Sequence, residues 1–575
     1  MKISENALKL KFGIMCTGTQ FKTWQAQCIQ DLLLMDNVQL SLLIIEEKQE
    51  IDFNDNDANA LLKKSANESI ILKLTKNINK ILSGILKLKL FYLYKNKCIR
   101  PNIDKSVDLT ELLRNTDRIF CKVIKKQGKF SHFFQDHDLK IVDSYGLDFI
   151  LKFGFNNIIG KILNVPKYGV WSFHHDDEKK YSGEPACFWE IYNNDPVTGA
   201  MLQRLTDRPD EGIVLKEGYY KTNLTSYSCN IDSIYKEAAK WPIYVVRDIQ
   251  NKNASYFDAY PTKNQTLFFK EPTNLQVLLF FCKIGKRKIF FYFNNKFRKL
   301  QWNIGVIHEP IEKVLDNRNK LQIHWYPLKR SDNFFLADPF GQMIDETLFI
   351  FCEKFDMDAG YGELATIEMK NMVYSNPKIF FTELKCHLSY PYIFNYQGET
   401  YLVPESRQNR SILLYKAEKF PEKWIQVNTI AKDINASDST IFYYNDMWWL
   451  MYTDQSIGEH SSLCILYSES LFGQWKSHSG NPVKQDIRSA RPAGTPFIKD
   501  NILYRPSQDC SRIYGGKIVI NKVKILTPSQ YLEETAAEIN PSHPYSEGTH
   551  TITSVGNYTL IDGCRSVFRN IHRFK

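Results

Sequence analysis

A repeated strand–turn–strand phrase in the second half of the chain constrains its fold more than any other feature. In each copy a short apolar strand meets a tight polar turn and then an aromatic strand. The copies recur at a period of about 50 residues, with no helical pattern between them. This pattern predicts a β-propeller rather than a sandwich. The clearest copies are Pro391–Phe394 with Gly398–Tyr401, Ser439–Phe442 with Asp446–Trp449, and Gly494–Phe497 with Asp500–Tyr504.

The length of the chain requires at least one further domain. Its 575 residues are too many for one hydrophobic core, because single cores stop growing at roughly 250 to 300 residues. Residues 331–575 have room for about five blades and are expected to form an all-β five-bladed propeller. We assign residues 261–330 to a connecting segment and the start of the propeller, and residues 1–260 to a separate domain.

The first 260 residues alternate apolar strands with amphipathic helices. Residues 11–16 and 40–45 have the pattern of two strands, and Trp24, Cys28 and Leu32 mark one face of a helix between them. This opening of a βαβ unit predicts a Rossmann-like α/β domain.

Two segments of this first domain are expected to carry no chemistry. Residues 46–69 are polar and rich in Asp and Asn, which predicts a flexible insertion. Residues 70–94 repeat apolar side chains at spacings of three and four among lysines, which predicts an amphipathic helix. Its basic face is either solvated or in contact with a membrane surface.

Composition and charge exclude several classes of protein. The formal net charge of +10 is spread in patches rather than gathered into one arm or groove, which argues against nucleic-acid binding. The twelve cysteines are scattered singly, so we expect free thiols in a reducing compartment and no metal site. Because no stretch reaches the roughly 18 apolar residues of a membrane span, the protein is expected to be cytoplasmic and without an integral membrane segment.

The most informative part of the first domain runs from Tyr168 to Gly183 and continues through Thr198-Gly199 and Asp207–Leu215. It resembles the catalytic core of the formyltransferases that use 10-formyltetrahydrofolate, which include methionyl-tRNA formyltransferase and the sugar N-formyltransferases. That family ends a strand in Asn-x-His and places an aspartate after a strand that begins with Thr-Gly. The resemblance implies a catalytic set made of His174 in the histidine position, Asp210 in the aspartate position and Ser172 in place of the asparagine.

These residue types suit transfer of a formyl group to an amine. The reaction passes through a charged tetrahedral intermediate, whose oxyanion needs hydrogen-bond donors and whose ammonium must lose a proton. Histidine can serve either need, and a buried Asp210 would fix the tautomer of His174 and raise its basicity. Ser172 replaces an amide donor by a hydroxyl, and losing one oxyanion donor costs about 100- to 1,000-fold in rate. Either a water or His175 compensates, or the domain has changed or lost the reaction.

A second stretch of the first domain implies a cofactor. Residues 148–155 resemble the strand and glycine turn along which the formyltransferases bind the folate pterin through backbone contacts, since glycine permits close approach. The resemblance implies that Phe153, Gly154 and Phe155 contact 10-formyltetrahydrofolate.

The propeller resembles the five-bladed, arabinanase-like glycoside hydrolases, and most closely the propeller portion of plant glucosamine inositolphosphorylceramide transferases. Six phrases carry this resemblance: Phe335–Phe340, His387–Tyr392, Val403–Ser406, Ser437–Thr440, Ser489–Gly494 and Tyr504–Cys510. In such propellers the inner strands direct polar side chains into a central channel, where paired carboxylates can cleave glycosidic bonds. The order of the acids here departs from the hydrolases, which place the acid glutamate after the second aspartate.

We expect one set of side chains to bind substrate in this channel. Arginines beside acids suit an anionic ligand such as a phosphosugar or nucleotide sugar. A network of ion pairs that only ties blades together is an equal alternative. The expected set consists of Asp338, Glu405, Asp438, Arg491, Arg505 and Asp509.

Together, the two resemblances imply formyl transfer from 10-formyltetrahydrofolate to an amino group of an amino sugar or glycoconjugate precursor. The alternative is glycosyl transfer or glycan binding in glycolipid or polysaccharide assembly, with the first domain holding a nucleotide sugar. A noncatalytic scaffold is a third hypothesis. The expected partners are an amino sugar, a nucleotide sugar or a glycolipid, and not nucleic acid.

Overall fold

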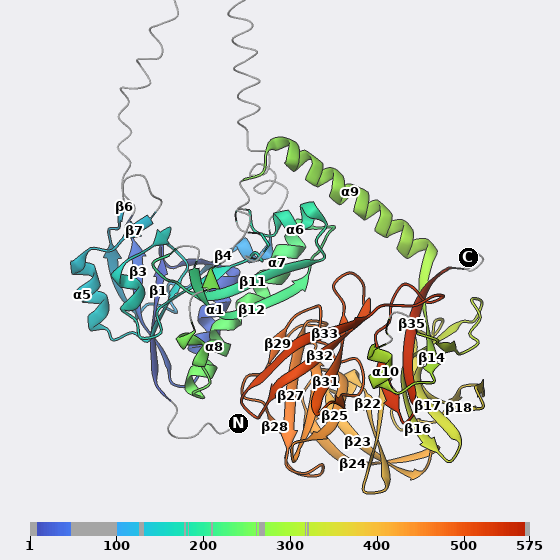
Figure 1. Cartoon of the computed structure of the whole chain (residues 1–575). Helices are drawn as coiled ribbons and strands as arrows, with labels where there is room; N and C mark the ends of the chain where they lie inside the picture. Colours follow the sequence, from blue (N-terminus) through green and yellow to red (C-terminus); the bar gives the residue numbers. More distant parts are fainter. Residues whose placement is uncertain are drawn as a thin grey trace, which may run out of the picture.

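The chain forms an α/β domain followed by a β-propeller in a computed structural model (Figure 1). Most of the expected insertion at 46–69 and all of the expected helix at 70–94 lie outside the described residues. The structure describes residues 8–47, 101–125, 131–177, 180–181, 183, 185–208, 211–259, 262–263, 271–316, 318 and 321–569.

An eight-stranded sheet forms the centre of the first domain, in the order β13-β12-β11-β10-β8-β1-β3-β5. The five strands from β10 to β5 run parallel, and β11, β12 and β13 continue the sheet antiparallel to them. The prediction of a Rossmann-like domain is confirmed. The strands are β1 (Leu10–Cys16), β3 (Val38–Glu46), β5 (Asp117–Cys121), β8 (Phe149–Lys152), β10 (Val170–His174), β11 (Val197–Arg204), β12 (Glu211–Lys221) and β13 (Thr262–Lys263).

Helices cover both faces of this sheet because side chains alternate between the faces along each strand. Phe12 and Ile14 of β1 pack toward α1, α7 and α8, whereas Met15 packs on the opposite face with Val142 of α5. Phe149 lies between Phe12 and Trp171, with ring centroids 5.2 and 4.0 Å away. The helices are α1 (Thr23–Leu33), α5 (Asp136–Ser144), α6 (Phe188–Asn193), α7 (Tyr227–Ala238) and α8 (Trp241–Gln250).

Five antiparallel sheets form the blades of the propeller, as the repeat predicts. In each of the first four blades, the strands named here follow one another along the chain. They are β16 (Phe334–Ile344), β17 (Thr347–Asp356), β18 (Tyr361–Lys370) and β19 (Val373–Tyr374); β21 (Ser389–Tyr396), β22 (Glu399–Glu405), β23 (Ser411–Lys419) and β24 (Lys423–Lys432); β25 (Ala436–Tyr444), β26 (Met447–Asp454), β27 (Ser462–Ser468) and β28 (Lys476–Ser477); and β30 (Phe497–Lys499), β31 (Ile502–Asp509), β32 (Lys517–Leu526) and β33 (Tyr531–Ile539).

The fifth blade takes strands from both ends of the propeller. β14 (Arg298–Ile307) precedes the first blade and pairs antiparallel with β35 (Tyr558–Phe568), the last strand of the chain. β15 (His324–Trp325) and β34 (Ile552–Val555) complete this sheet. The ring is therefore closed by a strand that begins at residue 298, within the segment assigned to the connection and the start of the propeller.

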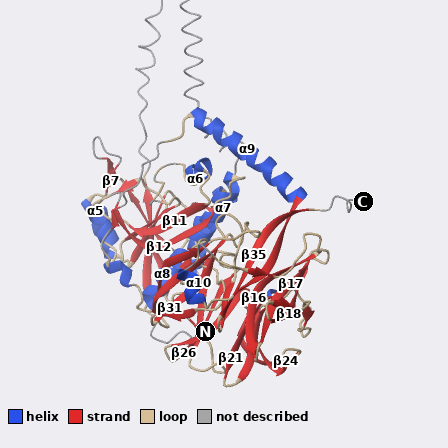
Figure 2. Cartoon of the chain, turned by 45° about the vertical axis from the view of Figure 1, so that its right-hand side comes forward, coloured by secondary structure: helices blue, strands red, loops and turns tan. Residues whose placement is uncertain are grey.

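The two domains contact each other directly. The indole nitrogen of Trp241, at the start of α8, donates to Gln485 of the third blade at 2.8 Å. The backbone nitrogen of Ile487 donates to the carbonyl of Tyr219 in β12 at 2.8 Å, and Val197 packs beside them. Helix α9 (Asn274–Phe297) also runs from the first domain to β14, along the outside of the molecule in both views (Figures 1 and 2).

Two further observations concern the described part of the chain. The eleven cysteines within the described ranges are all free thiols. None of the helices that the structure describes combines the length and the apolar character needed to cross a membrane.

Candidate functional site

A cavity of about 250 Å³ lies at the carboxyl edge of β10. Ser172 and His174 line it together because residues two apart on a strand share a face. Gln203 of β11 also lines the cavity and stands opposite Ser172 in the antiparallel register. Gly212 of β12 leaves room for this side chain, since a Cβ there would lie 2.2 Å from the Gln203 amide oxygen.

Gln203 and His174 form a short hydrogen bond in this cavity. The amide nitrogen of Gln203 lies 2.6 Å from Nε2 of His174. Because an amide nitrogen only donates, Nε2 of His174 accepts, and the ring carries its proton on Nδ1 in this arrangement. The bond therefore fixes the orientation of the His174 ring through a buried side chain.

Gln203 is a residue that the sequence analysis did not identify. It places a carboxamide in the same cavity as Ser172, where the formyltransferase pattern has its asparagine. The sequence does contain a signal for it. Gln203 directly follows the apolar run Ala200–Leu202, and a polar residue in a buried strand needs a hydrogen-bond partner. The missing amide donor is thus present in the cavity, but it comes from the neighbouring strand.

His175 also lines the cavity, and its ring packs among aromatic side chains of the first domain. Its ring stacks on Tyr235 of α7 with centroids 3.4 Å apart and meets Trp24 of α1 edge-on at 5.2 Å. Burial, with smaller effects of His174 and Lys22, holds the pKa of His175 well below its usual value. His175 is therefore a neutral wall residue that packs the first domain.

The predicted folate-binding turn lies beside this cavity rather than in its lining. The backbone nitrogens of Phe153 and Gly154 both donate to the carbonyl of Met15 at 2.8 Å. A Cβ on Gly154 would lie 2.9 Å from the backbone of Cys16, so packing against β1 already requires glycine there. Phe155 is buried with a positive φ of 62°.

The predicted aspartate cannot be placed. Asp210 lies outside the described residues, so its role stays a prediction. Its neighbour Glu211 lines the cavity and pairs with Arg208 at 3.0 Å.

The centre of the propeller contains a buried group of one histidine and two aspartates. His550 lies 3.2 Å from Asp338 of the first blade and 2.7 Å from Asp562 of the fifth. Burial alone would lower the pKa of His550, but Asp562 and Asp338 raise it well above its usual value. A protonated His550 therefore bridges two carboxylates and ties the first blade to the fifth. The sequence analysis identified only Asp338 of these three.

A second group ties the third blade to the fourth. Arg491 contacts both carboxylate oxygens of Asp438, at 2.5 and 3.2 Å, and Gln508 donates to the same carboxylate at 2.7 Å. The backbone nitrogen of Asp438 donates to Glu405 of the second blade at 2.8 Å. Burial and the charge of Asp438 raise the pKa of the Glu405 carboxyl to about 8.

These central side chains are sealed from solvent. None of Asp338, Glu405, Asp438, Arg491 and His550 is more than 6% exposed. The ring of Tyr514, which packs against the contact between the domains, lies 5.0 Å from the Arg491 guanidinium and 5.2 Å from the ring of His550. Hydrolysis requires an acid and a base on either side of a bound sugar. The geometry instead supports the alternative of an ion network that joins the blades.

The structure places two of the expected channel residues elsewhere. Arg505 pairs with Glu533 on the outermost strand of the fourth blade at 2.7 and 2.8 Å. Asp509 accepts from the backbone of Ser511 and lines a surface pocket of about 400 Å³. These contacts differ from the ion pairs that join Asp338, Asp438 and Arg491 to their partners, and a role of Arg505 and Asp509 in substrate binding stays a prediction.

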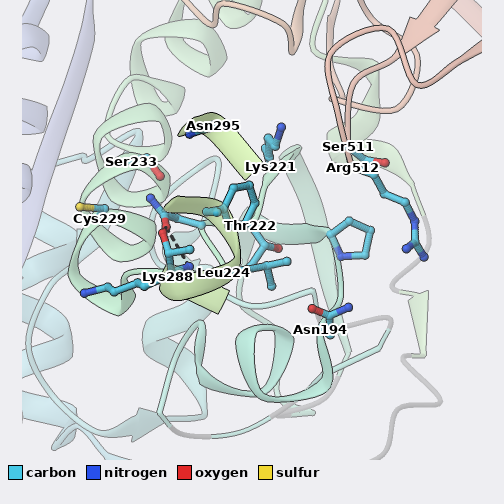
Figure 3. Close-up of a pocket in the computed structure, with 14 residues that line it drawn as sticks. Asn194, Lys221, Thr222, Leu224, Cys229, Ser233, Lys288, Asn295, Ser511 and Arg512 are labelled. Carbon is cyan, nitrogen blue, oxygen red and sulfur yellow. Dashed lines mark hydrogen bonds between the residues drawn. The ribbon is translucent and has the colours of Figure 1, made fainter. Parts of the chain in front are cut away.

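A larger pocket of about 660 Å³ lies between the two domains (Figure 3). Lys221 at the end of β12, Lys288 of α9 and Arg512 of the propeller line it together. Among its described lining residues there is no Asp or Glu. Three cations from three separate segments give this pocket the chemistry of an anion site.

The buried group around His550 yields a test of stability. Replacing His550 by Asn leaves two buried carboxylates without their counter-ion, which is expected to lower the free energy of unfolding of the propeller by about 3–5 kcal/mol. Because the pKa of His550 is raised by folding, its contribution is complete below about pH 6.5 and falls as the pH rises through the folded-state pKa. Calorimetry of both proteins should therefore show a smaller difference at about pH 9 than at about pH 7.

The matched control is His308→Asn, at an exposed histidine next to β14. This change is expected to alter the free energy of unfolding by less than about 0.5 kcal/mol. Equal losses in the two variants would show that the buried bridge contributes nothing.

Comparison with known proteins assigns a relationship to each half. The family model described as "Glucosamine inositolphosphorylceramide transferase 1, N-terminal" matches residues 328–547. Glucosamine inositolphosphorylceramide transferase 1 of Oryza sativa subsp. indica is 35% identical over 206 residues, which are 35% of this chain and 27% of that protein. The chain thus matches about a quarter of the length of this relative.

The relatives of the first domain match at lower identity. Methionyl-tRNA formyltransferase of Prochlorococcus marinus (strain MIT 9515) is 25% identical over 126 residues, which are 21% of this chain and 38% of that protein. The bifunctional polymyxin resistance protein ArnA of Wigglesworthia glossinidia brevipalpis is 27% identical over 140 residues, 23% of this chain and 21% of its own. The chain therefore joins a domain similar to the folate-dependent formyltransferases to a five-bladed propeller similar to that of the glucosamine inositolphosphorylceramide transferases.

Proposed function

We propose that the first domain transfers a formyl group from a folate-type donor to the amino group of an amino sugar or glycoconjugate precursor. The observation that carries this proposal is the convergence of Ser172, His174 and Gln203 on one cavity. A hydroxyl, an imidazole and an amide are the groups that acyl transfer to an amine requires. The similarity of this domain to formyltransferases supports the same chemistry.

Each of the three side chains has a distinct role in this proposal. The hydroxyl of Ser172 and the amide of Gln203 donate hydrogen bonds to the carbonyl oxygen on which negative charge develops. His174 accepts the proton that the attacking amine loses. Gln203 occupies Nε2 of His174 in the structure, so substrate binding must transfer the Gln203 amide from the imidazole to the carbonyl oxygen. The same movement frees His174 to act as a base.

The residues present fit the reacting end of a folate. A cavity of about 250 Å³ is slightly smaller than most small-molecule sites, which measure roughly 300–1,000 Å³, so it accommodates the reacting groups and not a whole folate. Phe153 and Phe173, whose rings stack at 6.1 Å, would hold a flat ring by aromatic contact. The donor would supply the formyl group, whose bond to a folate nitrogen is exchanged for a bond to the acceptor amine as one proton passes from the amine to the folate.

One feature supports an amino sugar as the acceptor class. The name of the propeller's relatives refers to glucosamine and to inositolphosphorylceramide. A separate feature, the interdomain pocket with Lys221, Lys288 and Arg512, has a charge that suits the phosphate of a sugar nucleotide.

That pocket also favours a second candidate function, in which the protein binds a nucleotide sugar for glycosyl transfer or glycan assembly. Strand β12 runs from one cavity to the other: Gly212 lines the cavity of His174, and Lys221 lines the interdomain pocket. Nine residues of extended strand place these two positions roughly 30 Å apart. A nucleotide sugar in this pocket would therefore not contact His174, and the two functions can be distinguished by variants of separate residues.

Ligand stabilisation distinguishes the two functions. A folate analogue at 100 times its Kd is expected to stabilise the wild-type protein by about 2.7 kcal/mol in a thermal-shift assay. The triple variant Lys221→Gln/Lys288→Gln/Arg512→Gln is expected to keep this shift. A shift with nucleotide amino sugars alone, abolished in the triple variant, would instead establish the second function. Gly154→Val is unsuitable here, because its side chain would displace β1.

The proposed role of the Gln203 amide as an oxyanion donor can be tested by removing this amide and introducing another one at position 172. Gln203→Leu is expected to lower kcat for formyl transfer by about 100- to 1,000-fold, because an oxyanion donor is lost. Adding Ser172→Asn to this variant restores an amide to the same cavity and is expected to recover at least about tenfold of the rate. Rates are measured by release of tetrahydrofolate with an amino-sugar acceptor.

The control for this series is Gln27→Leu, at an exposed glutamine of α1 that bonds Asp31. Its rate is expected to stay within about twofold of wild type. If Ser172→Asn recovers nothing while the double variant remains folded, Gln203 acts only by supporting the structure.

A further inference from the structure

Helix α9 is anchored to the first domain along one face. Val277, Phe280 and Ile284 are buried, and their spacing of three and four residues places them on one side of the helix. Phe280 stacks on Phe188 of α6 with ring centroids 4.4 Å apart. Lys283 donates to the carbonyl of Tyr192 at 2.8 Å. These contacts fix the rotation of α9 about its own axis.

The opposite side of α9 is apolar and exposed. Leu275 and Leu279 lie on this side near the start of the helix, and Ile289, Phe293 and Phe297 lie on it near the end. Steps of three and four residues connect the two groups through Cys282 and Lys286, so all of these side chains form one stripe. A helix in contact with water on this side would normally carry polar residues there. Large apolar side chains that are 38–66% exposed along α9 are Leu275, Leu278, Leu279, Ile289, Phe290, Phe291, Tyr292, Phe293 and Phe297.

The position of α9 in the molecule leaves this stripe accessible. Figures 1 and 2 show the helix crossing from the first domain to β14 on the outside of the molecule, while Arg287 near its middle bonds carbonyls of the first domain. Ile289 and Phe290 are 61% and 62% exposed, although each has an apolar side chain. A continuous row of exposed apolar side chains on the surface of a protein marks an interaction site.

The charge of the helix identifies what this stripe contacts. Residues 274–300 contain seven Lys or Arg side chains and no Asp or Glu. Two of these, Lys283 and Arg287, bond carbonyls of the first domain. Of the other five, Lys288 lines the interdomain pocket. Lys286 and Lys296 lie in the second half of the helix, where the aromatic side chains gather, and Arg298 and Lys299 follow at the start of β14.

We propose that the exposed stripe of α9 binds the surface of an anionic lipid bilayer. Aromatic and aliphatic side chains enter the boundary between headgroups and acyl chains, while Lys and Arg extend their charged ends to the lipid phosphates. A protein partner would be expected to supply acidic residues against Lys286, Lys296, Arg298 and Lys299. The proposal is independent of the chemistry at His174 and concerns where in a cell the protein works.

Vesicle flotation tests this proposal with the full chain. The wild-type protein is expected to float with vesicles of phosphatidylcholine mixed with phosphatidylserine, and to remain unbound with phosphatidylcholine alone. Added salt should release it, because exposed charges are screened. The variant Phe290→Ser/Phe293→Ser is expected to bind at least about tenfold more weakly, because it removes apolar surface from the stripe.

A matched control removes equally exposed apolar side chains from the propeller. In Ile498→Ser/Leu532→Ser the replaced residues are 52% and 53% exposed, close to the 62% and 52% of Phe290 and Phe293, and binding is expected to match wild type. A second variant, Lys286→Gln/Lys296→Gln, is expected to lose most of the salt-sensitive binding.

Three results would overturn the proposal. The first is equal binding of wild type to neutral and anionic vesicles, and the second is unchanged binding by Phe290→Ser/Phe293→Ser. The third is a wild-type dimer in size-exclusion chromatography that this variant converts to a monomer, which would show that a second copy of the chain covers the stripe.

Discussion

The pairing of β14 with β35 closes the propeller and at the same time fixes the far end of α9. The register runs from Arg298 opposite Phe568 to Ile307 opposite Thr559, and the backbone of Arg569 bonds the carbonyl of Phe297, the last residue of the helix. This pairing places the first and last strands of the propeller in one blade, so the ring cannot open without breaking that sheet. Because contacts with α6 hold the other half of α9, the helix spans roughly 36 Å between two fixed supports. The direction of the exposed side of α9 is therefore set by the first domain at one end and by the closing strand pair at the other.

The parts of the fold that were predictable depend on local patterns. The repeated phrase at Pro391, Ser439 and Gly494 has a fixed spacing, and alternation along residues 11–16 gives a strand without reference to the rest of the chain. The closing strand was not assignable, because nothing near Arg298 in the sequence indicates that its partner lies 270 residues away at Phe568. Pairing between distant segments is decided by the whole ring.

The candidate site shows the same division. His174 and Ser172 lie on one strand, so their common face follows from the period of two. Gln203 joins them only through the antiparallel register of β10 and β11, and His550 joins Asp338 only because the first and fifth blades meet. Arg505 was expected beside the channel acids because it belongs to the phrase Tyr504–Cys510, which carries the resemblance to the hydrolase propellers. Its partner in the structure is Glu533, on the outermost strand of the blade.

The propeller and the first domain each contain a cluster of polar side chains, and the two clusters differ in the chemistry they allow. Around His550 and Arg491 every charge has a counter-charge within hydrogen-bond reach and is sealed from water, so moving any of them costs several kcal/mol and the group acts to hold blades together. In the cavity of His174, by contrast, His174 and Gln203 are joined by one hydrogen bond that can be exchanged for another. Catalysis requires groups that can change partners without leaving a buried charge unpaired. On this argument we place the proposed chemistry in the first domain, to which the described lining of this cavity belongs.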